Sequence, residues 1–413
     1  MTNTATPTMS SDIPLADWTR AISRSALQDM LIASARPEIL SFALGLPAAE
    51  LFPTGKYAQS LVRVLSTDPR SLQYGPPLQR LKQQVLAIME LRGVHCREEQ
   101  IFLTAGAQQG MNMLTRLLLN PGGRVIMEQM TYPGFQQVLQ PYRPIISTVP
   151  TDLETGLDVD AVERLLLQEP KPSLIYSVAD GHNPLSVSMS VEKRRRLVEL
   201  ARRFRVPIIE DDPYGLLFYG DSCMPPLRSF EADWVCYVGT FSKILAPGVR
   251  TGWLVVPENL VAPLSVIKES MDINMAPLNQ RAISDYVETG ELWQHLPVLR
   301  AEYRRRRDAM LLALEKHFPM EARWRRPASG LFCWVELLAQ IDGSELLRLA
   351  IETEKIAFIP GFAFHAGNGA CCGSALRLNF SANAPHVIED GIARLARIVK
   401  QLIGRNGIVR QEA

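Results

Sequence analysis

Three short polar segments of this sequence combine residue types that could do chemistry together. In the segment 239–250, the hydroxyl residues Thr240 and Ser242 precede Lys243, and Arg250 follows seven residues after the lysine. A lysine that is desolvated in a pocket can lose its charge and become a nucleophilic amine. The hydroxyl groups and the arginine could hold a phosphate dianion. Taken alone, the segment is more typical of a surface lysine in a loop.

The second segment places three consecutive acids after an apolar run. Residues 206–209 are Val-Pro-Ile-Ile, and Glu210, Asp211 and Asp212 follow, with Tyr214 two residues further on. Carboxylates at the end of a buried strand are costly unless a cation or a metal pairs with them. A metal would need further acids or histidines nearby, and the segment provides none. The alternative is a carboxylate paired with a bound cationic ring, and we predict no metal site.

The third segment has the outline of a phosphate site. Residues 104–109 are Thr-Ala-Gly-Ala-Gln-Gln, between a short apolar strand and a helical pattern. Small residues let the backbone approach a ligand, and the free N–H groups at the start of a helix attract anions. Such a turn is structural in most proteins, so this segment is weak evidence on its own.

The three segments together specify one ligand. It needs a phosphate group, a ring nitrogen that gains a proton, and a carbonyl group that can condense with a lysine. Pyridoxal 5′-phosphate has all three features, and we therefore predict it as the cofactor.

Composition limits the classes of protein to which the chain could belong. The 413 residues include 44 Lys and Arg against 43 Asp and Glu, a formal net charge of +1. This balance argues against nucleic acid or an anionic membrane as a bulk electrostatic partner. Six cysteines without a CxxC pair favour reduced thiols in a cytoplasmic protein over structural zinc or a disulfide framework. Residues 1–12 lack the features of a secretory signal, and no apolar run is long enough to span a membrane.

Alternating strand and helix patterns must position the polar segments. The patterns predict strands near 101–104, 124–127, 174–178, 206–210, 235–239 and 252–256, with amphipathic helices between several of them. Such alternation is typical of an α/β domain with a mostly parallel sheet covered by helices on both faces. A long helix at 291–317, with the four arginines 304–307 on a solvated face, and strands near 331–336, 356–359 and 376–380 indicate a smaller α+β domain.

These patterns divide the chain into domains. We expect a flexible N-terminal tail at 1–20 and a large cofactor-binding domain at 55–290. Residues 21–54 and 291–413 would together form the small domain.

Short motifs in a fixed order make the chain resemble a known family. They are Ile-Leu-Ser-Phe-Ala-Leu-Gly-Leu-Pro (39–47), Leu-Gln-Tyr-Gly (72–75), Thr-Tyr-Pro-Gly (131–134), Asp-Asp-Pro-Tyr (211–214), Ser-Lys (242–243) and Arg-Leu-Asn-Phe-Ser (377–381). Their order and spacing resemble the fold-type I, class I/II aminotransferases, with the 2-aminoadipate and kynurenine aminotransferase-like branch as the nearest. The resemblance extends from about residue 25 to residue 403. It implies an aspartate aminotransferase-like fold with pyridoxal phosphate as the cofactor.

The resemblance implies roles for the residues at the reacting centre. Lys243 would form the internal aldimine with the cofactor and later act as the base at the substrate Cα. Asp211 would pair with the pyridinium nitrogen, which keeps the ring protonated and able to withdraw electrons. Asn183 and Tyr214 would hydrogen-bond the phenolic oxygen, and Tyr132 would stack on the ring.

The resemblance also assigns residues to the phosphate and the substrate. Arg377 would clamp the substrate α-carboxylate, a planar bidentate task suited to arginine. Tyr74 would reach the phosphate of the neighbouring subunit, which implies a homodimer with shared active sites. Backbone N–H groups and polar side chains would hold the cofactor phosphate, and these belong to Ala107, Gln108, Thr240, Ser242 and Arg250.

Four departures from the family pattern concern the substrate. The loop at 183–186 is Asn-Pro-Leu-Ser instead of Asn-Pro-Thr-Gly, and residue 107 is alanine instead of serine. Leu44 and Gly45 stand where Gly-Gly is usual, and we expect both to line the substrate pocket together with Asn183. Gly181 and His182 stand where Phe-Gln is usual, and Gly181 could open space for a bulky substrate. His182 could act as an acid or base beside the substrate, since histidine titrates near neutrality, or it could be a packed histidine.

The predicted activity is that of an aminotransferase in amino-acid metabolism or biosynthesis, which moves the α-amino group of an amino acid to a 2-oxo acid. The departures motivate an alternative on the same fold and cofactor: β- or γ-elimination, replacement, or ring-forming carbon–carbon bond formation on a bulky substrate such as S-adenosylmethionine, in specialised metabolism. A MocR-type regulator is a third hypothesis, disfavoured because no winged-helix segment precedes the motifs. An acidic substrate side chain could be recognised by Arg143, Arg323, Arg325 or Arg326.

Overall fold

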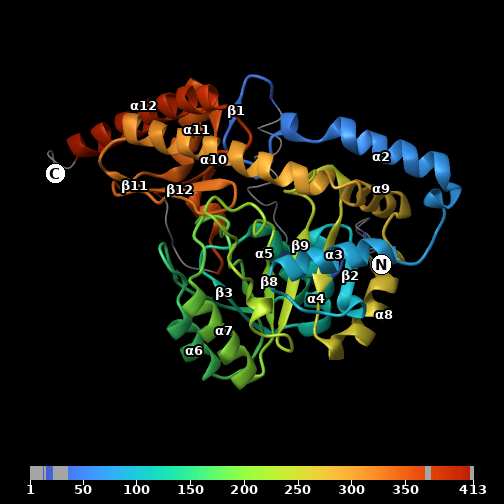
Figure 1. The fold of residues 1–413 in the computed structure, drawn as a ribbon. Helices are drawn as coiled ribbons and strands as arrows, with labels where there is room; N and C mark the ends of the chain where they lie inside the picture. Colours follow the sequence, from blue (N-terminus) through green and yellow to red (C-terminus); the bar gives the residue numbers. More distant parts are fainter. Residues whose placement is uncertain (1–12, 14, 22–35, 368–373, 410–413) are drawn as a thin grey trace, which may run out of the picture.

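A computed structural model describes residues 13, 15–21, 36–367 and 374–409 of the chain, and Figure 1 shows the fold. Most of the predicted tail at 1–20 lies outside the described residues. The described part forms two regions, each with its own sheet and helices. The larger region occupies the lower half of Figure 1, and the smaller region lies above it.

A seven-stranded sheet forms the larger region, in the order β2-β10-β9-β8-β7-β3-β4. Neighbouring strands are parallel except where β10 pairs with β2 and β9. The strands are β2 (Ile101–Thr104), β3 (Arg124–Glu128), β4 (Ile145–Val149), β7 (Pro172–Ser177), β8 (Ile208–Asp211), β9 (Val235–Thr240) and β10 (Gly252–Val255). The prediction of an α/β fold with a mostly parallel sheet is confirmed, and β4 is a strand that no sequence pattern had indicated.

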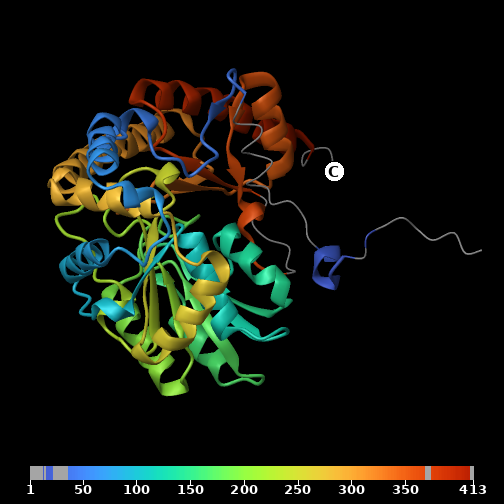
Figure 2. The ribbon, with the colours of Figure 1, turned by 90° about the vertical axis from the view of Figure 1, so that its right-hand side faces the viewer.

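Alternate residues of the central strands point to opposite faces of this sheet. Met127 and Val238 pack in one apolar cluster with helices α4 (Ala107–Leu118), α5 (Pro133–Leu139) and α8 (Val261–Asp272). Ile126 and Ile175 pack in another cluster with α6 (Val159–Leu166) and α7 (Val191–Phe204). Because helices cover both faces, the strands are almost continuously apolar. Figure 2 shows this layered arrangement from a second side.

Two helices from the N-terminal part of the chain pack against a helix that lies far away in sequence. Helices α2 (Thr54–Thr67) and α3 (Gln79–Leu91) both contact α9 (Pro277–Glu288). Figure 1 shows α2 and α9 side by side at the edge of the molecule. In the part of the chain that the structure describes, none of the helices combines the length and apolar character needed to cross a membrane.

A four-stranded antiparallel sheet forms the smaller region, in the order β11-β12-β15-β14. Its strands and helices are β11 (Ala322–Trp324), β12 (Phe332–Leu337), β14 (Ile359–Pro360), β15 (Ala375–Asn379), α10 (Glu291–His317), α11 (Gly343–Glu354) and α12 (Pro385–Val409). Strand β1 (Leu40–Ser41) pairs in parallel with β13 (Ile356–Ala357), so an N-terminal segment joins this C-terminal region. A small hairpin, β5 (Thr151–Asp152) and β6 (Gly156–Leu157), lies outside both sheets. The domain boundaries at 54–55 and 290–291 stay a prediction.

The four arginines 304–307 of α10 do not share a solvated face, and that prediction is wrong for two of them. Arg306 and Arg307 are buried. Arg306 donates hydrogen bonds to the carboxylates of Glu302 and Glu50 and to the carbonyl oxygen of Ser381. Four consecutive residues cover more than one helical turn, so a run of this length must include the buried face of a packed helix.

Candidate active site

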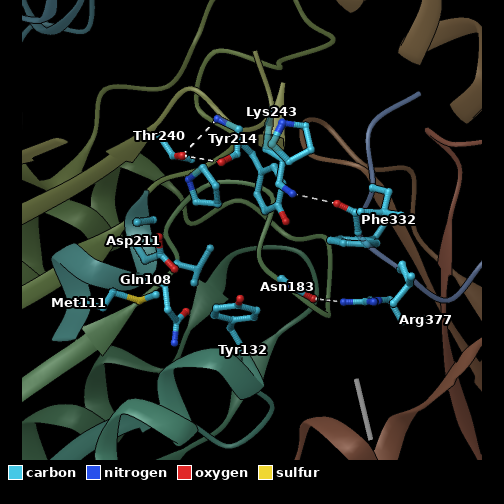
Figure 3. Close-up of a pocket in the computed structure, with 18 of the residues that line it drawn as sticks. Gln108, Met111, Tyr132, Asn183, Asp211, Tyr214, Thr240, Lys243, Phe332 and Arg377 are labelled. Carbon is cyan, nitrogen blue, oxygen red and sulfur yellow. Dashed lines mark hydrogen bonds between the residues drawn. The ribbon is translucent and has the colours of Figure 1, made fainter. Parts of the chain in front are cut away.

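A cavity of about 260 Å³ lies at the carboxyl ends of β8 and β9, where the two regions meet (Figure 3). Ligands bind at this edge of open α/β sheets. Two of the predicted site residues, Tyr74 and His182, do not line the cavity. The others do, and they are Leu44, Gly45, Ala107, Gln108, Tyr132, Asn183, Asp211, Tyr214, Thr240, Ser242, Lys243, Arg250 and Arg377.

Lys243 lies on the loop that follows β9 and presents its amine to the cavity. Its Nζ donates a hydrogen bond to the carbonyl oxygen of Gly45 at 2.9 Å. Burial, foremost, and the positive charges of Arg377 and Arg250 together lower the pKa of this amine to about 8, and the nearby Asp211 opposes the shift. An amine with this pKa is partly neutral at mildly alkaline pH, which is the state that a nucleophile or a base requires.

Asp211 is the last residue of strand β8 and also lines the cavity. Its Oδ2 accepts a hydrogen bond from the Tyr176 hydroxyl at 2.9 Å, whereas its buried Oδ1 has no hydrogen-bond partner. Burial raises the pKa of this carboxyl to about 7, and the neighbouring Asp212 contributes to the rise. A buried oxygen without a partner is costly, so this atom is suited to accept a hydrogen bond from a ligand.

An anion site lies where α4 begins. Gly106 precedes this helix with a φ of 85°, and a Cβ there would lie 2.5 Å from Nη2 of Arg250, so this position requires glycine. The same guanidinium donates to the carbonyl oxygen of Ala105 at 3.1 Å. The first turn of α4 contains no acidic residue, which leaves its positive end available to an anion. The hydroxyl groups of Thr240 and Ser242, 2.9 Å apart, line the same cavity.

Arg377, on β15 of the smaller region, brings a second cation to the cavity. Its Nη1 donates to Asn183 Oδ1 at 2.6 Å and its Nη2 donates to the carbonyl oxygen of Ala43, while its buried Nε has no partner. The guanidinium lies 4.0 Å from the ring centroid of Phe332. Burial lowers the pKa of this guanidinium to about 9, so a bound carboxylate would stabilise its charged form.

Two tyrosines complete the walls around these charges. The Tyr132 ring lies against Gly134, where a Cβ would come within 2.4 Å of the ring. Tyr214 is buried in an edge-to-face contact with Phe332, with ring centroids 6.1 Å apart. Burial raises the pKa of both hydroxyl groups, so both remain hydrogen-bond donors at neutral pH.

His182 is buried behind the cavity wall. Its Nδ1 accepts a long hydrogen bond of 3.4 Å from the backbone N–H of Leu185, and its Nε2 lies 3.6 Å from Oε1 of Glu128. Burial lowers the pKa of His182 to about 3 and raises that of Glu128 to about 8. Both groups are therefore neutral at pH 7, and the geometry favours a packed histidine over an acid or base in contact with substrate.

Other residues predicted to shape the substrate site also lie elsewhere. Gly181 has a φ of 54°, and a Cβ there would lie 2.9 Å from Oγ of Ser329, so this glycine does not open a space for a bulky substrate. Arg325 pairs with Glu154, and none of the four arginines suggested for an acidic side chain lines the cavity. Tyr74 is 82% exposed.

Two residues that sequence patterns did not indicate contribute to the site. Phe332 contacts both Arg377 and Tyr214 from β12, and no motif connected it with them. Tyr176 holds Asp211 from the neighbouring strand β7. A buried hydroxyl in a central strand needs a partner, and that requirement could have identified Tyr176.

The comparisons with known proteins agree with this geometry. The model of the family "Aminotransferase class I and II" matches residues 51–395. The chain is 33% identical to the 2-aminoadipate transaminase of Thermus thermophilus, over 92% of this chain and 95% of the relative, and 32% identical to aromatic-amino-acid aminotransferase 1 of Thermococcus litoralis, over 96% of each. The solved structure of Pyrococcus horikoshii kynurenine aminotransferase in complex with PMP superposes with a TM-score of 0.88, at 32% identity over 94% of this chain and 97% of that chain.

The fold and the cavity define a fold-type I α/β enzyme with an amine, a carboxylate and an anion site around one cavity. The chain belongs to the class I and II aminotransferase family, and it is a transferase of amino groups. The family implies pyridoxal phosphate as the cofactor and amino acids and oxo acids as substrates. The comparisons do not favour elimination, replacement or ring formation.

Proposed function

We propose that the cavity around Lys243 holds pyridoxal 5′-phosphate and that the enzyme uses it to move the α-amino group of an amino acid to a 2-oxo acid. The proposal rests on one observation: the amine of Lys243, with its lowered pKa, and the unpaired oxygen of Asp211 line the same cavity. When bound, the cofactor supplies a carbonyl group that accepts the amino nitrogen and a ring that withdraws electrons.

Asp211 holds a proton on the ring nitrogen. Because Tyr176 already occupies Oδ2, the unpaired Oδ1 is the oxygen that would accept a hydrogen bond from the ring. A cationic ring at this atom favours the carboxylate form and opposes the effect of burial on the pKa. Tyr132 would stack on the ring, and the hydroxyl of Tyr214 and the amide of Asn183 would donate to its phenolic oxygen, since all three residues line the cavity.

Lys243 moves the proton at the substrate Cα. Its pKa of about 8 makes the amine basic enough to accept this proton and acidic enough to return it. In the cofactor-free protein, the amine donates to the carbonyl oxygen of Gly45, 2.9 Å away.

Two separate cationic regions hold the two anionic groups. The phosphate binds the N–H groups of Ala107 and Gln108 at the start of α4, with Thr240, Ser242 and Arg250 around it. The substrate α-carboxylate binds Arg377, whose unpaired Nε and desolvated guanidinium are suited to a planar anion.

The remaining wall of the cavity favours an apolar or aromatic substrate side chain. Leu44, Leu46 and Phe332 line it, and the suggested recognition arginines do not. The relatives named for aromatic amino acids, 2-aminoadipate and kynurenine provide the first donors to test.

A homodimer in the cytoplasm is the form that we propose for the enzyme. Tyr74 is 82% exposed, and the apolar side chains of Leu72 and Ile273 are 73% and 69% exposed. Exposed apolar residues of this kind are typical of a surface that a partner covers. The Tyr74 hydroxyl would then reach the phosphate in the neighbouring subunit.

The proposal is tested by mixing the purified protein, loaded with pyridoxal phosphate, with amino acids one at a time. We expect some donors to convert the cofactor absorbance to that of pyridoxamine phosphate, and a 2-oxo acid to reverse the change. Release of a side-chain leaving group without this reversal would contradict amino-group transfer. Light scattering at working concentration tests the dimer.

A further inference from the structure

Two loops supply polar side chains to the cavity, and one arginine outside the cavity binds both loops. The loop after β7 contains Asp180 and, three residues later, Asn183, and the turn after β8 contains Asp212 and, two residues later, Tyr214. Arg92 follows helix α3, is only 3% exposed, and does not line the cavity. Its side chain has no role in the chemistry proposed above.

The guanidinium of Arg92 lies between the carboxylates of these two loops. Its Nη1 lies 3.0 Å from Oδ2 of Asp212, and its Nη2 lies 3.3 Å from Oδ2 of Asp180. Nη2 also donates to the carbonyl oxygen of Met224 at 3.1 Å. Burial alone would lower the pKa of this guanidinium, but the nearby acids, Asp212 foremost, outweigh burial and raise it above its ordinary value.

Each aspartate also has partners other than Arg92. Asp212 Oδ1 accepts from the backbone N–H of Gly215 at 2.7 Å, and its Oδ2 accepts from the Tyr237 hydroxyl at 3.0 Å. Oδ1 of Asp180 lies 2.8 Å from Nη2 of Arg194. Arg194 joins Asp180 to the carbonyl oxygen of Pro225, at 2.9 Å, whereas Arg92 joins Asp180 to Asp212 in the turn after β8.

The contacts of the Arg92 guanidinium limit which residues can stand at positions 215 and 92. A Cβ at Gly215 would lie 1.8 Å from Nη1 of Arg92, a distance that real Cβ atoms do not show. Glycine at 215 therefore lets the guanidinium reach the second loop. A lysine at position 92 would keep the charge, but its single ammonium group lacks the planar fork that binds two carboxylates at once.

We propose that Arg92 is a positioning residue that sets the separation of the two loops and thereby places Asn183 and Tyr214 for their contacts with the cofactor. The inference rests on the function proposed above, because the cofactor is what these two side chains contact. It also extends to the substrate, since Asn183 binds Arg377 through a hydrogen bond of 2.6 Å. Movement of the first loop would therefore move the guanidinium that receives the substrate carboxylate.

The test compares Arg92→Lys with Arg124→Lys in the full-length protein. Arg124 is a matched control because it is 5% exposed and its guanidinium donates to Ser147 Oγ at 2.7 Å and to the carbonyl oxygen of Gln168 at 3.1 Å. It stands at the amino end of β3, whereas the cavity lies at the carboxyl ends of the strands.

Three measurements separate positioning from a general effect on folding. In the cofactor-free protein, Arg92→Lys should speed hydrogen exchange in segments 178–188 and 211–216, and Arg124→Lys should not. In the loaded protein, Arg92→Lys should shift the midpoint pH of the cofactor absorbance change. It should also lower kcat by about 100-fold, the effect of misplacing active-site groups by about 1 Å.

The proposal would be overturned if Arg92→Lys and Arg124→Lys exchanged hydrogen at the same rate in each segment, with the same midpoint pH and with kcat values within about twofold of each other. If Arg92→Lys does not fold, Gly215→Ala displaces the same guanidinium, and the same results support or overturn the proposal. Wild-type protein without cofactor absorbance or transfer activity would instead contradict the function proposed above. The exchange measurement needs no cofactor, so the two failures are distinguishable.

Discussion

The chain buries two groups of charged residues beside each other, and their hydrogen bonding differs. In the cavity, Oδ1 of Asp211 and Nε of Arg377 have no hydrogen-bond partner. The pKa of Lys243 is lowered to about 8 and that of Asp211 is raised to about 7. In the neighbouring network of Arg92, Arg194, Asp180 and Asp212, both carboxylate oxygens of each aspartate are paired, although Nε of Arg92 has no partner.

This difference in pairing separates a carboxylate that can bind a ligand, that of Asp211, from carboxylates that stabilise the fold, those of Asp180 and Asp212. Asp211 and Asp212 are adjacent, and both are at least 95% buried, yet only Asp211 keeps an unpaired oxygen. A fully paired buried charge can stabilise a loop, whereas an unpaired one is retained at a cost to stability. Burial and residue type therefore do not distinguish Asp211 from Asp212, whereas the unpaired oxygen and its position on the cavity do.

Replacing Lys243, which lines the cavity, should cause the largest loss of activity. Lys243→Ala removes the amine, so we expect transfer activity to fall at least about 1,000-fold, because general acid–base catalysis alone contributes about 100- to 10,000-fold. Cofactor that remains with the wild-type protein after borohydride reduction and denaturation should be lost from the variant. Lys193→Ala is the control, since Lys193 also donates to a glycine carbonyl, that of Gly156, at 2.9 Å. Equal activity in the two variants would refute the role of Lys243.

Asp212→Asn tests how much the hydrogen-bonded network around Arg92 contributes to stability. The substitution removes one of the two charges that hold Arg92 and leaves a buried cation partly unpaired, so we expect a loss of about 3–5 kcal/mol in the free energy of unfolding. Urea denaturation of the cofactor-free protein at pH 7 measures this loss. A change below about 1 kcal/mol would mean that the network contributes little to stability.

Asp211→Asn should change stability in the opposite direction. The pKa of Asp211 is about 7 in the folded protein against 3.8 for the ordinary group, so the folded state binds more protons between these values and stability falls as pH rises through them. Asparagine carries no charge, so at pH 8 the cofactor-free variant should be more stable than wild type, by at most about 4 kcal/mol. The difference should shrink as pH falls toward 4.

The same variant should lose function while it gains stability. Asparagine cannot hold a positive charge on the ring nitrogen, so kcat should fall although the protein unfolds at a higher temperature. Thermal melting of the cofactor-free protein at several pH values, beside activity of the loaded enzyme, gives both results. If Asp211→Asn and Asp212→Asn changed stability alike, the comparison between the two groups would fail.

The smallest effects are expected behind the cavity wall. His182 and Glu128 are neutral at pH 7, so His182→Gln should leave kcat within about threefold and should not move the pH profile of activity. Glu128→Gln should remove a loss of stability that wild type shows as pH rises from about 4.5 to about 8, since the pKa of Glu128 is raised across that range. A kcat that falls 100-fold in His182→Gln would restore the histidine as an acid or base.

Much of the cavity could be predicted because its residues lie at the ends of predicted strands. Asp211 and Thr240 end β8 and β9, and parallel strands bring their carboxyl ends to one edge of a sheet. Phe332 and Tyr176 were not predicted, because their contacts join segments far apart in sequence. His182 does not line the cavity although its neighbour in sequence, Asn183, does, and its packed environment was one of the two alternatives that the sequence left open.

The sequence by itself determined the fold class, the family and the set of groups that could bind a cofactor, because strand and helix periodicity and the order of short motifs are local properties of the chain. The tertiary structure decided which of those groups are unpaired. Asp211 and Asp212 are the same residue type side by side, yet Tyr176 of β7 binds the first, whereas Arg92, which follows α3, and Tyr237 of β9 bind the second. The physical reason is that the free energy of a buried charge depends on the atoms around it, and distant parts of the chain supply those atoms.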